Sequence, residues 1–170
     1  MTAAHKPINR EFTLDDLKPL LLEARISHTI LVQTWSSLEE TEKFLSLAGQ
    51  TEFIVGVIGW VNFKENVVPQ IERLMAHPHA TYLKGLRHQV HDEPDKNWLI
   101  NSQVLRGLAT LREYGLTYDL LIRPREIPAA VSCIERLPGQ NFVIDHIAKP
   151  KISQGWDVDW EDAISRLADF

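Results

Sequence analysis

Continuous apolar runs that alternate with amphipathic segments constrain the fold of this chain more than any other feature. The runs occupy residues 26–34, 53–61, 82–90, 117–123 and 141–148. Their apolar residues are consecutive rather than alternating, which is typical of parallel strands covered on both faces. We therefore predict five parallel strands in sequential order.

Amphipathic segments precede and separate these runs. Apolar residues recur at helical spacing in residues 13–24, 36–49, 67–75, 98–114, 127–137 and 160–167. Repeated βα units form parallel sheets with right-handed crossovers. An open doubly wound sheet and a (β/α)₈ barrel both fit this order.

The residues at the ends of the runs favour the barrel. No glycine-rich phosphate-binding motif comes after any run, which weakens the case for a nucleotide-binding doubly wound sheet. Polar residues stand where the runs end, and barrels place catalytic groups at the carboxyl ends of their strands. A whole barrel needs about 250 residues, and the chain has 170. We predict an α/β fold: a partial (β/α)₈ TIM barrel of about five βα units, with helices on its outer side only. Its first and last strands are missing, and residues 1–170 form a single incomplete domain.

The stretch "GLRHQVHDEPD", residues 85–95, carries the first candidate site residues. An imidazole at His88 and a guanidinium at Arg87 could together bind a carboxylate or polarise a carbonyl. A core histidine bonded to the backbone explains His88 equally well. The acidic residues Asp92, Glu93 and Asp95 are expected to be solvated.

The stretch "FVIDHIAKP", residues 142–150, ends a strand with an acid and an imidazole. Neighbours on a strand point to opposite faces. If His146 points into the barrel, it can serve as a metal ligand, an acid–base group or a substrate donor. Asp145 would then pair with an outer helix or the next loop. Alternatively, Asp145 caps a turn while His146 packs.

Three further residues are predicted to contact a substrate. Arg123 comes after a run and is a candidate anion clamp, since a guanidinium matches a carboxylate bidentately. Trp60 is expected at the core or the rim, where aromatic rings suit sugar rings. Gln33 is a polar side chain at the end of the first run.

Charge and apolar content exclude several classes of protein. The net charge of -5 without a basic stripe argues against nucleic acid as a partner. No apolar stretch approaches the roughly 20 residues of a membrane span. Residues 1–12 lack the apolar run of a signal peptide. We expect a cytoplasmic protein with a small-molecule substrate and no membrane or nucleic-acid partner; an oligomer is compatible with the sequence.

Five stretches together resemble the amidohydrolase-related family, in its lactonase-like branch. They are "LVQTWSSLEET", "IVGVIGWVNF", "GLRHQVHDEPD", "GLTYDLLIRPREIPAA" and "FVIDHIAKPKI". The resemblance implies a distorted (β/α)₈ barrel of carbohydrate metabolism that opens lactones or similar small cyclic esters by adding water. It implies that His88 and His146 are catalytic and that Arg87 lies near the substrate, a lactone or hydroxy acid. It is compatible with one divalent metal, zinc, on His146, and equally with no metal.

Two motifs of the family are absent. The first-strand H-x-H-x-W motif does not open this chain, and no F-G-S-D-W motif occurs after residue 142. In the family, the aspartate of the second motif is the expected general base or metal ligand. We therefore expect the 170-residue chain to be inactive as a lactonase on its own. A nonoxidative decarboxylase on the same scaffold and a non-catalytic barrel fragment are the alternatives.

Overall fold

The computed structural model describes residues 9–155 and 157–170, and in them five strands form one parallel sheet. The strands are β1 Thr29–Val32, β2 Ile54–Gly59, β3 Leu83–His88, β4 Thr117–Leu120 and β5 Phe142–Ile144, side by side in chain order. The predicted strand order is confirmed. We predict no signal peptide in residues 1–12. Residues 1–8 of this segment lie outside the described residues.

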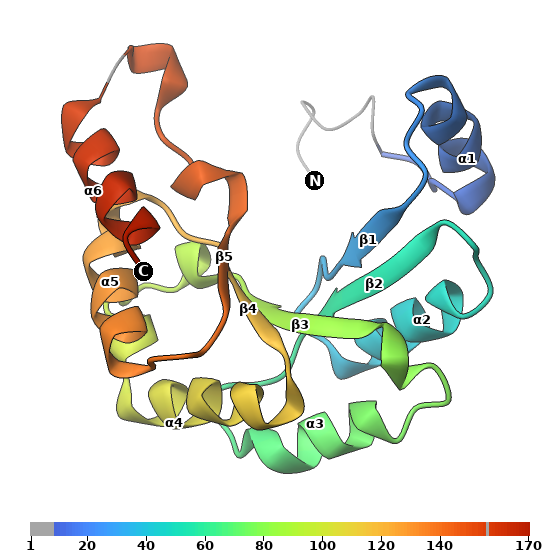
Figure 1. Ribbon diagram of the computed structural model, residues 1–170, viewed down its shortest axis with the longest axis horizontal. Helices are drawn as coiled ribbons and strands as arrows, with labels where there is room; N and C mark the ends of the chain where they lie inside the picture. The colour runs from blue at the N-terminus through green and yellow to red at the C-terminus, as the bar shows by residue number, and fades with distance from the viewer. Residues whose placement is uncertain (1–8, 156) are drawn as a thin grey trace.

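Helices cover the convex side of this curved sheet. The α-helices are α1 Leu14–Glu23, α2 Leu38–Ala48, α3 Val67–Met75, α4 Ser102–Leu111, α5 Ile127–Arg136 and α6 Val158–Ala168. Short 3₁₀ turns are η2 Ala80–Tyr82, η3 Val90–Asp92, η4 Trp98–Ile100, η5 Arg112–Tyr114, η6 Pro124–Glu126, η7 Asp145–Ala148 and η8 Ile152–Gln154. In Figure 1, α2 to α5 line the outside of the sheet. No described helix is long and apolar enough to cross a membrane.

The core lies between the sheet and these outer helices. Leu86 and Tyr118 of the strands are fully buried, as are Leu45 of α2, Ile71 of α3 and Leu108 of α4. Alternation along β3 and β4 then turns their neighbours to the concave side. The core therefore fixes which strand residues can face the inside of the barrel.

The bounds of two predicted elements change the interpretation of the sequence. The helix expected over residues 98–114 is divided at Asn101, whose side chain accepts a hydrogen bond from Gln103 N and caps α4. The strand expected over residues 141–148 ends at Ile144, and the turn η7 begins at Asp145.

The sheet is half of a barrel. Within the described residues, β1 and β5 each pair with one strand only, whereas a closed (β/α)₈ barrel has eight strands. Ile30 of β1 and Val143 of β5 have 53% and 47% of their surface exposed. The predicted partial barrel is confirmed.

Candidate active site

An arginine on the concave side of the sheet joins three strands. Arg87 of β3 donates a hydrogen bond from Nη1 to Asp145 Oδ2 at 2.7 Å, and one from Nη2 to the Gln33 carbonyl. Gln33 Nε2 lies 3.5 Å from the Arg87 carbonyl. The side chains of Arg87 and Asp145 are only 12% and 15% exposed. This charge-assisted contact therefore fixes the guanidinium at the carboxyl ends of β1, β3 and β5.

A second carboxyl group lies next to Arg87. Asp119 of β4 is the Cα partner of Arg87 in the sheet, and it is buried. Burial, and secondarily the charge of Asp145, raise the pKa of Asp119 to about 6, although Arg87 opposes the shift. Its Oδ1 is buried and has no hydrogen-bond partner among the described residues. Asp119 can therefore exchange a proton near neutral pH.

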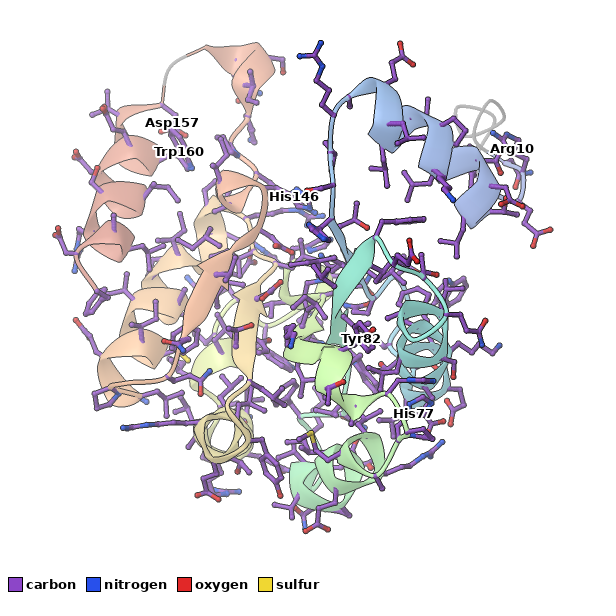
Figure 2. The ribbon with its side chains drawn as sticks, turned by 45° about the vertical axis from the view of Figure 1, so that its right-hand side comes forward. Arg10, His77, Tyr82, His146, Asp157 and Trp160 are labelled. Atoms are coloured by element: carbon purple, nitrogen blue, oxygen red, sulfur yellow. The ribbon has the colours of Figure 1, made fainter. Side chains whose placement is uncertain are left out.

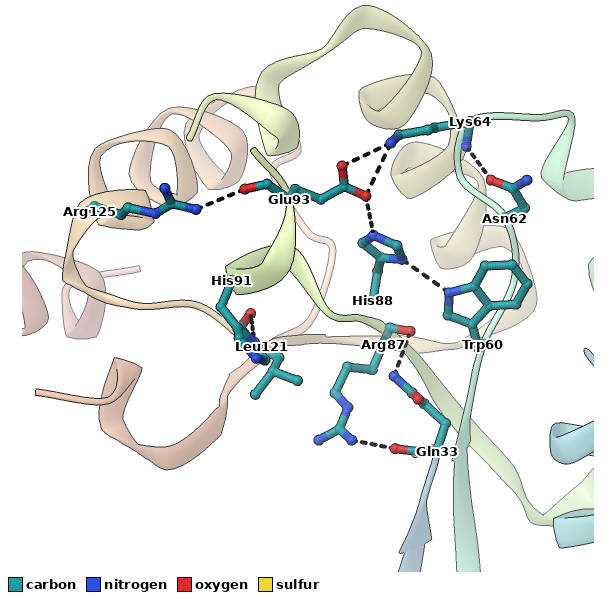
Figure 3. Close-up of polar contacts among 10 residues, drawn as sticks. All are labelled: Gln33, Trp60, Asn62, Lys64, Arg87, His88, His91, Glu93, Leu121 and Arg125. Carbon is teal, nitrogen blue, oxygen red and sulfur yellow. Dashed lines mark hydrogen bonds and ion pairs between the residues drawn. The ribbon is translucent and has the colours of Figure 1, made fainter. Parts of the chain in front are cut away.

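His88 has both ring nitrogens engaged (Figure 3). Trp60 Nε1 donates to His88 Nδ1 at 3.0 Å, and His88 Nε2 lies 2.8 Å from Glu93 Oε1. The ring stacks on Trp98, with centroids 4.4 Å apart and planes at 10°. Burial lowers the pKa of His88, and the Glu93 carboxylate only partly offsets this. His88 is therefore a fixed imidazole, bonded to side chains and not to the backbone.

Glu93 is largely buried, whereas the sequence predicts a solvated residue. Its side chain is 16% exposed, and its carboxylate accepts hydrogen bonds from Lys64 Nζ at 2.9 and 3.1 Å. Asp92 and Asp95 are exposed, as expected. The expectation for Glu93 was wrong because the chain turns at η3 and brings its carboxylate back over His88.

The turn after β5 has an unusual backbone. Residues 146–149 have φ of 51°, 48°, 57° and 52°, all in the left-handed region, which side chains disfavour by roughly 1–2 kcal/mol per residue. Trp160 Nε1 of α6 donates a hydrogen bond to the Ile147 carbonyl at 2.9 Å. Strain of this kind is found where surrounding structure imposes it, often near functional sites.

This turn changes the expected roles of Asp145 and His146. Asp145 pairs with Arg87 of β3, not with an outer helix or the next loop. The strand ends before Asp145, so strand alternation no longer dictates which neighbour faces inward. His146 is exposed and is placed by the turn between β5 and α6 (Figure 2). Its predicted inward orientation and catalytic role stay predictions.

Arg123 anchors a loop. Its Nη1 donates to the His91 carbonyl at 2.8 Å, and its Nη2 lies 3.6 Å from Asp92. The side chain is 47% exposed, so its predicted role as an anion clamp stays a prediction.

Sequence reasoning missed two polar residues that the structure makes candidates. His91 is buried, with Nε2 3.4 Å from Lys149 Nζ, and burial followed by that ammonium lowers its pKa. Asp119 is the other. Its position inside the apolar run "TYDLLI" could have identified Asp119 as a candidate. Burying a carboxylate costs free energy unless it has a partner, so an acidic residue in such a run indicates a specific role.

The described residues do not fit a metal site by themselves. No group of three or more His, Cys, Asp or Glu side chains in residues 9–155 and 157–170 could hold an ion.

Comparison with known proteins gives the family of this chain. The model of the amidohydrolase family matches residues 4–170. The chain belongs to the amidohydrolase family. An L-fucono-1,5-lactonase of Burkholderia ambifaria is 33% identical to this amidohydrolase chain, in an alignment that covers 95% of this chain. An L-fucono-1,5-lactonase of Burkholderia multivorans is 30% identical, in an alignment that covers 94% of this chain.

Solved structures agree with this assignment. A Burkholderia multivorans amidohydrolase crystallised with bound zinc is 28% identical, has a TM-score of 0.89, and is matched over 99% of this chain and 59% of its own. An amidohydrolase of Bifidobacterium longum subsp. infantis, 18% identical with a TM-score of 0.72, supports the fold alone. The chain spans 55% of the length of both lactonases.

Proposed function

We propose that this chain supplies part of the active site of an enzyme that opens a hydroxylated lactone by adding water. The observation that carries the proposal is the identity of 33% and 30% to two L-fucono-1,5-lactonases over nearly the whole chain. The Arg87 site supports it, because opening a lactone produces a carboxylate that a guanidinium can bind.

The reaction needs a proton acceptor and a positive group. Water adds to the lactone carbonyl carbon, the ring C–O bond breaks, and the ring oxygen leaves with a proton as a hydroxyl. We assign to His146 the donation of a proton to the leaving ring oxygen. The acceptor of the water proton is expected from the part of the barrel outside this chain, because the aspartate that the family resemblance implies for this role is not in it. Arg87 stabilises the negative charge that develops on the carbonyl oxygen and remains on the product.

The other residues that were predicted to contact the substrate are given roles in binding, not in proton transfer. Trp60 is proposed to contact the lactone, and Arg123 to attract the anionic product. Gln33 is fully buried, and its predicted contact with the substrate stays a prediction. His88 follows Arg87 on β3, and its nitrogens are engaged by Trp60 and Glu93; its predicted catalytic role stays a prediction. Zinc on His146, the cytoplasmic location, an oligomer and a single incomplete domain over residues 1–170 stay predictions.

A substrate screen tests the reaction class. The chain is flanked by the segments of the Burkholderia ambifaria lactonase that lie outside the matched region, so that a whole barrel can form. We expect hydrolysis of L-fucono-1,5-lactone and related sugar lactones, and a strong loss of rate in Arg87→Met and His146→Gln. Release of CO₂ from aromatic carboxylic acids without lactone hydrolysis would overturn the proposal in favour of the decarboxylase.

A further inference from the structure

A chain of polar contacts runs along the carboxyl rim of β2 and β3 (Figure 3). It leads from Trp60 through His88 and Glu93 to Lys64, with steps of 3.0, 2.8 and 2.9 Å. Its first members are partly buried, while the side chain of Lys64 is 59% exposed. A hydrogen-bonded network of this kind holds its partly buried members in one arrangement when each is satisfied.

The direction of each hydrogen bond is set by the chemistry of its groups. The indole N–H of Trp60 can only donate, so His88 Nδ1 must be the acceptor and carry no proton. A neutral imidazole then carries its proton on Nε2, which donates to the Glu93 carboxylate. A protonated His88 would have no lone pair for Trp60.

The surroundings of His88 keep the ring neutral. Burial against Trp98 lowers its pKa, and the Lys64 ammonium lowers it further. Glu93 acts in the opposite direction, but its charge is shared with Lys64. The acceptor nitrogen that Trp60 needs is therefore preserved across neutral pH.

We propose that His88 is a positioning residue that fixes the Trp60 indole as a flat platform for the apolar face of a hydroxylated lactone ring. This inference rests on the proposed lactonase function. It restricts the substrates of the enzyme to ring compounds that have one face made of carbon–hydrogen bonds. Trp60 follows the last residue of β2 and is half-buried, so part of the residue is exposed at the carboxyl end of the strand. An indole has large apolar faces and one polar group, its N–H. In Trp60 this N–H donates its hydrogen bond to His88.

The first test observes the indole directly. In ¹⁵N-labelled chain, the Trp60 Nε1–H signal is assigned by its loss in Trp60→Phe. His88→Phe keeps an aromatic ring against Trp98 and removes the acceptor, so the Trp60 N–H should exchange with water at least about tenfold faster. His88→Asn offers an oxygen near the position of Nδ1 and should restore slow exchange. Unchanged exchange in His88→Phe, with its fold verified by circular dichroism, would overturn the proposal.

The second test uses L-fucose, which has a hydroxylated ring but no ester to cleave. Titration should shift the Trp60 signal saturably. His88→Phe should weaken binding by up to roughly tenfold, because an indole that is no longer held in place makes its aromatic contact with the ring poorly. Failure of L-fucose to move the Trp60 signal would overturn the platform even if lactone hydrolysis is found. A platform without lactone hydrolysis would support this proposal and contradict the proposed function, so the two failures are distinguishable.

The pH dependence of the same signal is a third measurement. The Trp60 hydrogen bond should persist from pH 8 down to below the ordinary histidine pKa of about 6.5, because the pKa of His88 is lowered. Loss of this hydrogen bond with a midpoint at or above about pH 6.5 would contradict the proposal that a neutral His88 fixes the Trp60 indole.

Discussion

At the scale of single residues, the site is organised by a fixed guanidinium and a fixed, neutral imidazole. Arg87 is held by Asp145 and the Gln33 carbonyl, and His88 by Trp60 and Glu93. Fixing such groups before a substrate arrives is the principal way in which a protein stabilises developing charge.

Asp119 gives a prediction about stability and pH. Its folded pKa of about 6 exceeds its ordinary value of 3.8, so the folded state binds the proton more tightly. The fold is therefore favoured by this group below pH 3.8 and loses that stability as pH rises through 6. Asp119→Asn should stabilise the chain by about 1–3 kcal/mol at pH 8 and change little at pH 4, as measured by urea unfolding.

The control for Asp119 is Asp92→Asn, whose side chain is 62% exposed. It should change the free energy of unfolding by less than about 0.5 kcal/mol at either pH. A destabilised Asp119→Asn at pH 8 would show that its charge contributes favourably to the fold.

The Arg87–Asp145 pair gives a second prediction. Arg87→Met leaves the Asp145 carboxylate unpaired at a site with 15% exposure, so we expect a loss of about 3 kcal/mol in the free energy of unfolding. Asp145→Asn in the same chain should recover part of this loss. A double-mutant cycle measures the coupling, and a coupling near zero would mean that the contact does not persist in solution.

Single residues were predicted unevenly from the sequence. Arg87 and His88 were found because they stand where an apolar run ends. Asp119 was missed because a run rich in Leu and Ile was interpreted as core, whereas its carboxylate faces the concave side next to Arg87. The contacts of Glu93 depend on the path of a loop, which periodicity does not describe.

At the scale of elements, the turn η7 sets the position of His146 and Asp145. The left-handed residues 146–149 come after a strand of three residues, Phe142–Ile144. Helix α6 contacts the turn through the indole of Trp160. The apolar pattern predicted the existence of β5 but not its early end, because Ile147 and Ala148 continue the apolar run in a conformation that sequence periodicity cannot reveal.

Glycine substitutions test the strain in this turn. Ile147 is 53% exposed at φ 48°, so Ile147→Gly should relieve a β-branched residue in the left-handed region and stabilise the chain by up to about 1 kcal/mol. Val143→Gly, at a residue of β5 that is 47% exposed, is the matched control and should destabilise. Equal losses in both variants, measured by urea unfolding, would mean that the turn is not strained.

At the scale of the whole molecule, the chain is half of an amidohydrolase barrel, and we propose that it carries part of a catalytic site. The order and parallel pairing of its strands could be predicted from the repeated βα pattern, and α2 to α5 lie on the outer side of the sheet as expected (Figure 1). The groups that complete a lactonase site could not be predicted, because the described residues contain neither a closed barrel nor three clustered metal ligands.

The most direct test compares lactone hydrolysis by two proteins in a pH-stat with L-fucono-1,5-lactone. One is the 170-residue chain, and the other is the same chain flanked by the additional segments of the Burkholderia ambifaria lactonase. We expect turnover by the flanked chain and a rate at least about 10²-fold lower for the chain alone, because the expected general base lies outside the chain and a general base is worth about 10²–10⁴ in rate. Comparable turnover by both would contradict the account and place the complete catalytic site within residues 1–170.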